Sequence, residues 1–301
     1  MSHLDTNIAS FTVDVEDGIS IAMRDAFGVK MDPTDRVFEH TERILEIFSE
    51  KSFKGTFFIL GIIAEHYPEL VKRIGSEGHE LAVHGYNHLI FSKMTPEKAF
   101  QELDSAKKLI EDLSGQEVYG HRAPAFSINP KTSWGLDVIA KCGFTYDSSI
   151  MPCKGLRYGW PEFSKNIVMV NTANGNRIIE VPMSTTKFLS REIPTCGGSY
   201  LRLLPYNMTK KFFKKVQKEK PVVVYIHPYE LDNQRYPEYF FTELKKASIK
   251  KNLSLRSNWL FRNTVEEKFR KLMALSGSKP IIDIIKEKQE AAELPVFEIS
   301  D

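Results

Sequence analysis

The chain of 301 residues is long enough for one large α/β domain or two average ones, and its 42% hydrophobic and 27% charged residues are ordinary for a globular protein. This composition excludes a disordered, collagen-like or fibrous chain. The formal net charge of +2 is far below the surplus of cations that nucleic-acid binding usually needs, so nucleic acid is not expected as a partner.

Strand-like and helix-like segments alternate along most of the chain. We predict strands rich in β-branched and apolar residues at 8–16, 55–60, 80–83, 117–121, 144–147, 178–182 and 221–226. Helical spacing of apolar residues lies between them, at 35–51, 62–76, 96–114 and 208–219. This alternation predicts βα units and a mainly parallel sheet, either open or closed into a barrel.

No linker rich in Gly, Ser or Pro divides the chain, so we predict a single domain over residues 1–278. Residues 279–301 are expected to form a charged, solvated helix and a tail. The segments 150–178 and 184–207 are rich in Gly, Pro, Ser and Asn and predict long loops, which in compact domains often carry function.

The N-terminal residues, the apolar stretches and the cysteines together predict the cellular compartment. The N-terminal residues lack the basic segment and apolar run of a secretory signal, and no stretch approaches the roughly 18 apolar residues of a membrane span. The three cysteines are scattered and form no CxxC pair. We therefore expect a cytoplasmic protein without a membrane span. Its oligomeric state stays open, with a homo-oligomer among the options.

Polar side chains collect where the predicted strands end, which is where α/β folds place their sites. Asp14, Glu16 and Asp17 close the first strand, and strand alternation points Asp14 and Glu16 to the same face. Three such carboxylates are costly unless they meet a cation. A solvated loop whose carboxylates cap the next helix explains this segment equally well on its own.

A pair of histidines follows the strand at 80–83. His84 and His88 are four residues apart, a spacing that places both on one face of a helical turn and is used to hold a divalent metal. A pair that arises by chance or packs in the core is the alternative.

Three further polar segments end strands. Arg122 is able to pair with a carboxylate in a fixed geometry, and Pro124 stiffens the turn after it. Asp147 ends another short strand, where a helix cap is the alternative. His227 directly follows a buried apolar strand and is well placed as a general acid, with a buried structural histidine as the competing interpretation.

Taken together and in this order, the segments resemble the polysaccharide deacetylases of carbohydrate esterase family 4, the NodB-homology group. Within it, the likeness is greatest to the branch that accompanies bacterial exopolysaccharide and surface-polysaccharide gene clusters. It rests on VDVEDG, KGTFFILG, GHELAVHGYNH, GHRAPAFSI, GFTYDSSIMP, GGSYLRLLP and YIHPYEL. It runs from Phe11 to about Glu230, and more loosely to about residue 273. The resemblance implies a single-domain, distorted (β/α) barrel of about seven mainly parallel strands.

The resemblance also implies one divalent metal ion, with zinc expected first and cobalt, nickel or manganese open. His84 and His88 match the metal-binding histidines of the family, which are joined by an acidic residue. Most members have two adjacent aspartates, whereas here Asp14 is followed by valine. We favour Glu16 as the third ligand because it shares a strand face with Asp14, and we keep Asp17 as the alternative.

The same resemblance assigns acid–base roles. Asp14 matches the base and Arg122 the arginine that holds it. His227 matches the general acid, and Asp147 matches the aspartate that orients this acid. We therefore expect Asp147 to bond one ring nitrogen of His227.

The expected reaction is removal of an N-acetyl group from an amino sugar of a surface polysaccharide or of its cytoplasmic precursor. The partner would be an N-acetylated sugar or oligosaccharide, contacted by Pro124 and Tyr200. Aromatic residues in the loops are able to stack on sugar rings, although loop packing explains them as well. The alternatives are a metal-independent amide hydrolase of the allantoinase type and a non-catalytic sugar-binding protein.

Overall fold

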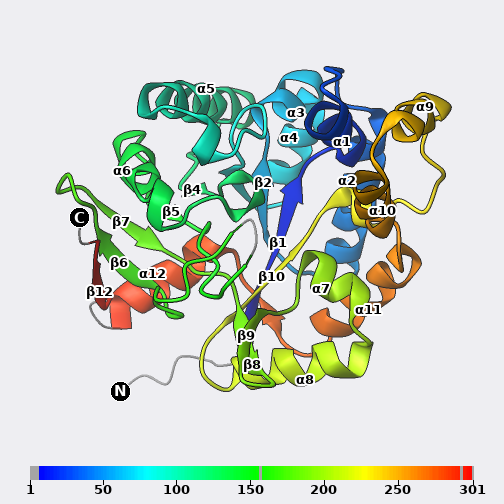
Figure 1. Cartoon of the computed structure of the whole chain (residues 1–301). Coiled ribbons are helices and arrows are strands. Elements are labelled where there is room, and N and C mark those ends of the chain that lie inside the picture. Colours follow the sequence, from blue (N-terminus) through cyan, green and yellow to red (C-terminus); the bar gives the residue numbers. More distant parts are fainter. Residues whose placement is uncertain (1–6, 156–157, 292–293, 300–301) are drawn as a thin grey trace.

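The computed structural model of the chain describes residues 7–155, 158–291 and 294–299. Strands run through its centre and helices surround them (Figure 1). Seven parallel strands form the main sheet, in the order β10 (Val222–Ile226), β1 (Ile8–Val15), β2 (Thr56–Ile59), β3 (Glu80–Val83), β4 (Gly120–His121), β5 (Tyr146–Asp147) and β7 (Arg177–Glu180). The predicted distorted (β/α) barrel of about seven mainly parallel strands is confirmed.

Additional strands extend the edges of this sheet. β6 (Val168–Asn171) runs antiparallel to β7, β12 (Val296–Glu298) lies parallel to β6, and β11 (Gly277–Ser278) pairs with β1. A separate hairpin consists of β8 (Thr185–Phe188) and β9 (Arg191–Pro194). β7 and β10 do not pair with each other in the described part of the chain, so the barrel is open between them. The predicted long loops at 150–178 and 184–207 thus hold short strands.

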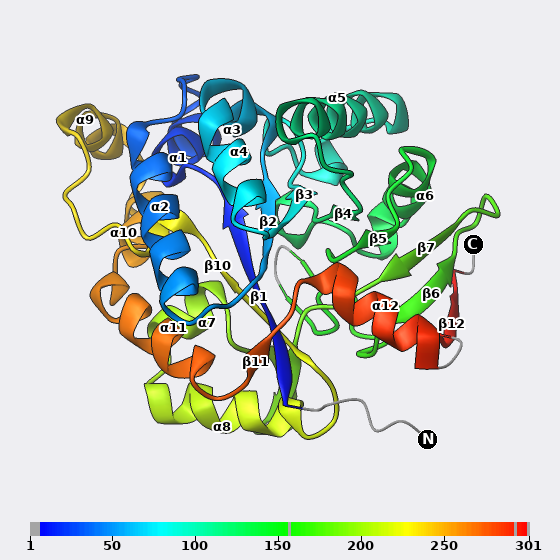
Figure 2. The same ribbon diagram turned by 180° about the vertical axis from the view of Figure 1, so that it is seen from behind.

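The helices lie on the outside of the barrel in both views (Figures 1 and 2). They are α1 (Gly18–Phe27), α2 (Asp35–Glu50), α3 (Gly61–His66), α4 (Pro68–Ser76), α5 (Pro96–Ser114), α6 (Trp134–Lys141), α7 (Gly198–Leu203), α8 (Tyr206–Gln217), α9 (Glu238–Lys246), α10 (Ile249–Ser257), α11 (Val265–Met273) and α12 (Ile281–Ala291). Short 3-10 turns are η1 (Phe91–Lys93), η2 (Pro124–Phe126), η3 (Pro130–Thr132), η4 (Pro228–Glu230) and η5 (Arg262–Thr264). No helix in the described ranges is long and apolar enough to cross a membrane.

Local sequence signals explain where several helices begin and end. The predicted helix over 96–114 is confirmed, because Thr95 caps it by accepting from the Lys98 backbone N–H and Gly115 ends it at φ 67°. The single helix predicted over 62–76 is wrong. It is divided into α3 and α4 at Tyr67, because Pro68 has no N–H to continue the helical ladder.

The two faces of β1 show why polar residues reach the interior. Phe11, Val13 and Val15 pack in the core between the sheet and the outer helices. The alternate residues Thr12 and Asp14 are also buried and face the inside of the barrel. An interior face with polar residues on a fully buried strand indicates a site at the end of the barrel where β1 finishes.

The predicted C-terminal helix is present as α12, but it is not a solvated appendage. Ile281, Ile282 and Ile285 are buried against the inner cluster of the barrel. The backbone N–H groups of Ile281 and Ile282 donate to side chains of Thr56 and Glu80, which begin β2 and β3. The helix lies between β11 and β12 when seen from behind (Figure 2). The division of the chain after residue 278 stays a prediction.

Candidate metal and catalytic site

The strand ends bring four predicted site residues to one place. Glu16 follows β1, His84 follows β3 and His227 follows β10. His227 Nε2 lies 3.6 Å from Glu16 Oε1 and 3.8 Å from Asp14 Oδ2. These groups come from parts of the chain more than 200 residues apart, and the parallel pairing of β1 with β10 and β2 aligns their carboxyl ends.

Glu16, His84 and His88 form a compact cluster of metal-ligating side chains. Glu16 Oε2 lies 2.8 Å from His88 Nε2 and 3.5 Å from His84 Nε2. One ligand atom of each residue lies within 4.8 Å of the others. Glu16 Oε2 is buried, and the angles of its close contacts do not satisfy a hydrogen bond. Three ligand atoms aimed at one point, rather than paired with one another, fit a bound cation.

The backbone after β3 sets the orientation of the two histidines. His84 Nδ1 lies 2.8 Å from the carbonyl oxygen of Arg122 and donates to it, which leaves Nε2 with a lone pair for a metal. Residues 84–88 form a loop, so the prediction of a helical turn is wrong. Gly85 at φ 80° and His88 at φ 55° reverse the chain and return His88 to the cluster.

Electrostatics favour the charged form of Glu16. Burial alone would raise the pKa of this carboxyl, but the nearby histidines His88 and His227 outweigh burial and hold the pKa well below its usual range. The negative charge in the centre of the cluster is therefore kept at neutral pH.

Asp17 lies outside this cluster, which corrects the alternative prediction of Asp17 as a metal ligand. Its carboxylate caps α1 by accepting from the backbone N–H groups of Ile19 and Ser20 at 3.3 and 3.0 Å. It also accepts from the backbone N–H and the hydroxyl of Thr34. These four hydrogen bonds engage both oxygens of the Asp17 carboxylate. Asp17 is the N-cap residue of α1, whereas Glu16 lies at the end of β1.

Asp14 and Arg122 form a buried ion pair. Arg122 Nη1 lies 2.7 Å from Asp14 Oδ1, and the same nitrogen donates to the hydroxyl of Thr12. The guanidinium also donates to the carbonyl and the hydroxyl of Ser148 and lies 4.0 Å from the centroid of the Phe58 ring. Arg122 is fully buried, so these contacts fix the Asp14 carboxylate with its second oxygen toward His227.

The carboxylate partner of His227 differs from the prediction. His227 Nδ1 lies 3.0 Å from Glu230 Oε2, and Arg202 Nη1 holds the other oxygen of Glu230 at 3.0 Å. Burial lowers the pKa of His227, but the carboxylates of Glu16 and Glu230 outweigh burial and raise the pKa to about 9. The carboxylate that contacts His227 Nδ1 is therefore Glu230, which lies in the same turn as His227.

Asp147 belongs to a different buried group, and its predicted bond to His227 is wrong. Asp147 Oδ1 lies 2.7 Å from His121 Nδ1 and accepts from the hydroxyl of Ser149. Strand pairing places His121, Asp147 and Glu180 side by side on β4, β5 and β7. Burial and the charge of Asp147 hold the pKa of Glu180 well above its usual range.

Ser149 links this buried group to the site. Its hydroxyl accepts from the backbone N–H of Ala123 at 2.7 Å while donating to Asp147. Asp147 thereby supports the backbone directly after Arg122, and its effect on the site passes through this turn.

Two predicted substrate contacts occupy separate positions. Pro124 is buried in η2, and a Cβ built on Gly85 would lie 3.5 Å from its ring, so Pro124 packs against the loop of the two histidines. Tyr200 lies in α7 near Tyr158. Their roles toward a substrate stay predictions.

Three residues around His227 were not predicted to belong to the site: Glu230, Arg202 and Tyr229. Glu230 was detectable as the fourth residue of a His-Pro-Tyr-Glu turn, in which its side chain also accepts from the backbone N–H of His227. Arg202 is 28 residues away, and no local spacing connects it to this turn. The Tyr229 ring is stacked on the His227 ring, with centroids 4.7 Å apart and planes at 19°.

Two family models match successive parts of the chain. Residues 32–146 match the model described as polysaccharide deacetylase, and residues 148–285 match one described as a domain of unknown function, DUF3473. The second match begins directly after β5, within the sheet. Residues 32–146 are therefore similar to polysaccharide deacetylases, and the remaining strands complete the same barrel.

Characterised relatives match a limited part of the chain. A peptidoglycan deacetylase of Helicobacter pylori is 33% identical over 109 residues, which are 36% of this chain and 36% of that protein. A chitooligosaccharide deacetylase of a Bradyrhizobium species is 29% identical over 100 residues, 33% of this chain and 43% of that protein. The chain thus spans well under half the length of these relatives.

Solved structures share the fold over nearly the whole chain. A Mycobacterium smegmatis protein assigned as a polysaccharide deacetylase is 19% identical with a TM-score of 0.61, covering 98% of this chain and 94% of that one. The allantoinase PuuE is 15% identical with a TM-score of 0.57, covering 96% and 92%. At these identities the likeness concerns the fold alone.

Proposed function

We propose that this protein hydrolyses the N-acetyl amide of an amino sugar in a glycan, as a metal-dependent deacetylase. The observation that carries this proposal is the convergence of Glu16, His84 and His88 on one point beside Asp14 and His227. Amide hydrolysis needs an activated water on one side and a proton for the leaving amine on the other. The site offers a carboxylate for the first task and a charged histidine for the second.

The donor set of one carboxylate and two imidazoles fits a divalent transition metal, with zinc as our first candidate and cobalt, nickel or manganese as alternatives. Such an ion, when bound, polarises the amide carbonyl and lowers the pKa of a bound water toward about 7. Glu16, His84 and His88 would hold it. This intact set favours a metal-dependent enzyme over a metal-independent hydrolase of the allantoinase type.

Asp14 is our candidate for the general base. Arg122 and the buried strand face fix one carboxylate oxygen, and the other faces the centre of the site. Fixed geometry matters because a base must lie within hydrogen-bond reach of the proton that it accepts. Asp14 would take the proton of the attacking water.

His227 is our candidate for the general acid. Glu230 holds Nδ1, so the proton on Nε2 points to the space shared with Asp14 and Glu16. The raised pKa of about 9 keeps the imidazolium charged at neutral pH. His227 would donate this proton to the nitrogen as the amide C–N bond breaks, which leaves an amine on the sugar and releases acetate.

For the biological substrate we propose a surface polysaccharide or its precursor. The relatives are named for peptidoglycan and chitooligosaccharides, both built from N-acetylated amino sugars. The more specific prediction, a branch linked to bacterial exopolysaccharide, is retained as part of this proposal.

The test is acetate release from a panel of N-acetylated sugars, oligosaccharides and lipid-linked intermediates, with and without added divalent metal. We expect release that requires the metal and is lost in the Asp14→Asn variant. A metal-loaded, folded protein that releases no acetate from any member of the panel contradicts the proposal. Release that is equal in wild type and variant also contradicts the role of Asp14.

A further inference from the structure

Large apolar side chains are exposed on α10 and on the turn that follows it. Ile249 is 81% exposed, Leu253 64%, Leu260 51% and Phe261 55%. Single exposed apolar residues are ordinary, but several close together mark a contact surface, because their burial against a partner lowers the free energy. We call these four residues the α10 surface.

The helix α10 is attached to the rest of the protein without burying its own residues. None of its residues whose burial the structure describes is buried, and nine residues are too few for a helix to be stable alone. Near its start, Lys251 donates to the Ala26 carbonyl and lies 5.8 Å from the centroid of the Phe27 ring. After its end, Trp259 packs edge-on against the Tyr236 ring. These attachments leave the α10 surface free for a partner.

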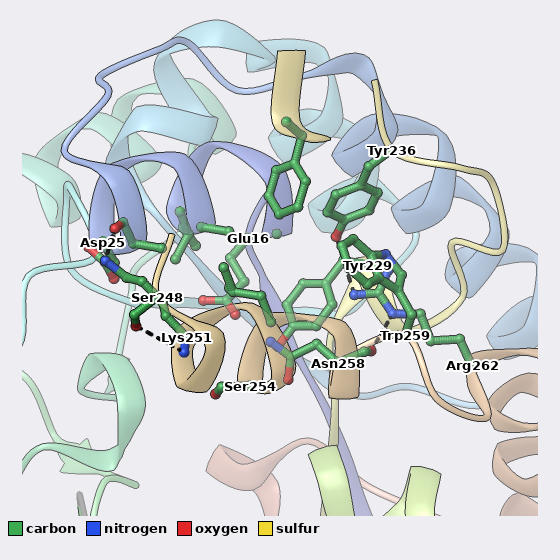
Figure 3. Close-up of a pocket in the computed structure, with 16 residues that line it drawn as sticks. Glu16, Asp25, Tyr229, Tyr236, Ser248, Lys251, Ser254, Asn258, Trp259 and Arg262 are labelled. Atoms are coloured by element: carbon green, nitrogen blue, oxygen red, sulfur yellow. Dashed lines mark hydrogen bonds between the residues drawn. The ribbon is translucent and has the colours of Figure 1, made fainter. Parts of the chain in front are cut away.

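The two sides of α10 face different surroundings. Lys251 and Leu255 line a cavity of about 600 Å³ together with Glu16, and Figure 3 shows Lys251 in the wall of this cavity. Ile249 and Leu253 are four residues apart and therefore share a helix face. Each precedes a cavity-lining residue by two positions, which is a rotation of about 200° around the helix. The α10 surface therefore lies on the side of the helix away from the cavity.

Positive charge accompanies these apolar residues. Residues 245–262 contain six Lys or Arg and no Asp or Glu, in a chain whose formal net charge is only +2. Lys245, Lys246 and Arg256 are exposed, and Lys246 has an ion-pair partner, Glu243 of α9, at 2.6 Å. Two copies of such a surface would repel each other, so the charge favours an anionic partner.

Phe261 has a backbone conformation that bulky residues rarely adopt. Its φ is 62°, and its carbonyl oxygen accepts from the backbone N–H and the hydroxyl of Thr264 at 3.0 and 2.8 Å. Strained backbone of this kind is concentrated at segments that contact ligands or partners. A strained turn that leaves an aromatic ring in water supports a contact between this ring and a partner.

We infer that the α10 surface docks on a membrane that contains anionic lipids. Its four apolar side chains would enter the boundary between headgroups and acyl chains, and the neighbouring cations would lie among the anionic headgroups. Nucleic acid supplies negative charge without an apolar medium, so it fits this surface less well. The cavity beside Glu16 would then lie next to the membrane, on the other side of α10. Docking of this kind is independent of the proposed hydrolysis.

Sedimentation of the full chain with lipid vesicles tests this docking without turnover. Vesicles of phosphatidylcholine with phosphatidylglycerol are compared with vesicles of phosphatidylcholine alone, at low and at high salt. We expect binding to the first kind that weakens as salt rises, and about ten-fold weaker binding to the second. Equal binding to both kinds, or no binding to the anionic vesicles, overturns the inference.

An apolar variant locates the contact. Ile249→Ser should weaken binding to the anionic vesicles about ten-fold, because it removes an apolar side chain from the interface. Leu189→Ser is the matched control, because Leu189 is also 81% exposed but lies in the turn between β8 and β9. A dimer in solution that Ile249→Ser dissociates overturns the inference, because a second copy then covers this surface.

A charge variant tests the contribution of the cations. Lys245→Gln combined with Lys246→Gln should weaken binding to the anionic vesicles about ten-fold and reduce its dependence on salt. Lys210→Gln combined with Lys211→Gln makes the same change in net charge at another pair of adjacent exposed lysines, on α8, and should leave binding unchanged. Binding that falls equally in the variants and in their controls overturns the assignment of the contact to α10.

Discussion

The side of the site with the proposed base (the base side) and the side with the proposed acid (the acid side) hold their charged groups in different ways. On the base side, Asp14 and Arg122 come from strand ends 108 residues apart, and the register of the sheet brings them together. On the acid side, His227 and Glu230 are three residues apart in one turn that begins with Pro228. One pair depends on the whole barrel and the other on a local turn.

The two sides should respond differently to amino-acid substitutions. Arg122 is fully buried and paired with the Asp14 carboxylate, so loss of that carboxylate leaves a buried charge uncompensated. Glu230 keeps Arg202 when His227 is replaced, and His227 keeps Glu16 when Glu230 is replaced. We therefore expect larger effects from substitutions on the base side.

The largest effect is expected for Asp14→Asn. Asparagine keeps the size of the side chain but cannot accept the proton of water, so kcat should fall roughly 10²- to 10⁴-fold. Metal content should persist, because Asp14 lies outside the ligand cluster. Asp104→Asn is the control and should leave kcat unchanged, because Asp104 is a half-buried carboxylate on α5 that pairs with Lys108. Full activity of Asp14→Asn would transfer the base role to another carboxylate.

His227→Ala should lower turnover of the amide about 100-fold, because the leaving amine then lacks its proton donor. An activated acetyl ester, whose leaving group needs no proton, should lose less than about ten-fold. Steady-state kinetics on both substrates measure the difference. Equal losses on the two substrates would show that His227 binds substrate or packs, and does not donate a proton.

The neighbouring carboxylates Glu16 and Asp17 should separate metal binding from folding. Glu16→Gln should weaken metal binding at least ten-fold, as measured by calorimetry, since it removes one ligand of the cluster. Asp17→Ala should leave metal affinity unchanged and lower the free energy of unfolding by about 1 kcal/mol, because it removes the side-chain cap of α1. The reverse pattern would make Asp17 the ligand.

Contacts made across the sheet were predicted from the sequence, whereas the contact within the turn after His227 was not. The strands were predicted from the residue pattern. The ion pair of Asp14 with Arg122 and the convergence of Glu16 with His84 and His88 were predicted from the resemblance to a known family, and they agree with strand ends meeting at one edge of a parallel sheet. The partner of His227 was not predicted, because a family pattern pointed to Asp147 at another strand end. Local geometry decided that contact: the turn after His227 brings Glu230 to the ring first.

The position of α10 could not be predicted from the sequence either. α10 has almost no apolar periodicity, and none of its residues whose burial the structure describes is buried, so its sequence does not indicate a core helix. The packing of Trp259 against Tyr236 and against Phe240 of α9 holds this segment in place. Lys251 joins it directly to α1 through the Ala26 carbonyl and the Phe27 ring. Such placement depends on tertiary contacts that no single-segment pattern contains.

The smallest and most specific effect is expected for Glu230→Gln, which tests the acid side directly. The carboxylates around His227 raise its pKa to about 9, so activity that needs the imidazolium should be retained as pH rises and fall only through about pH 9. Glutamine removes one negative charge, which favours the neutral ring and lowers this pKa. The alkaline limb of kcat/KM should therefore move to lower pH by about one unit, with little change in rate near pH 6. Asp147→Asn is the comparison, because Asp147 is bonded to His121 and should not shift this limb. A shift with Asp147→Asn and none with Glu230→Gln would restore Asp147 as the orienting group.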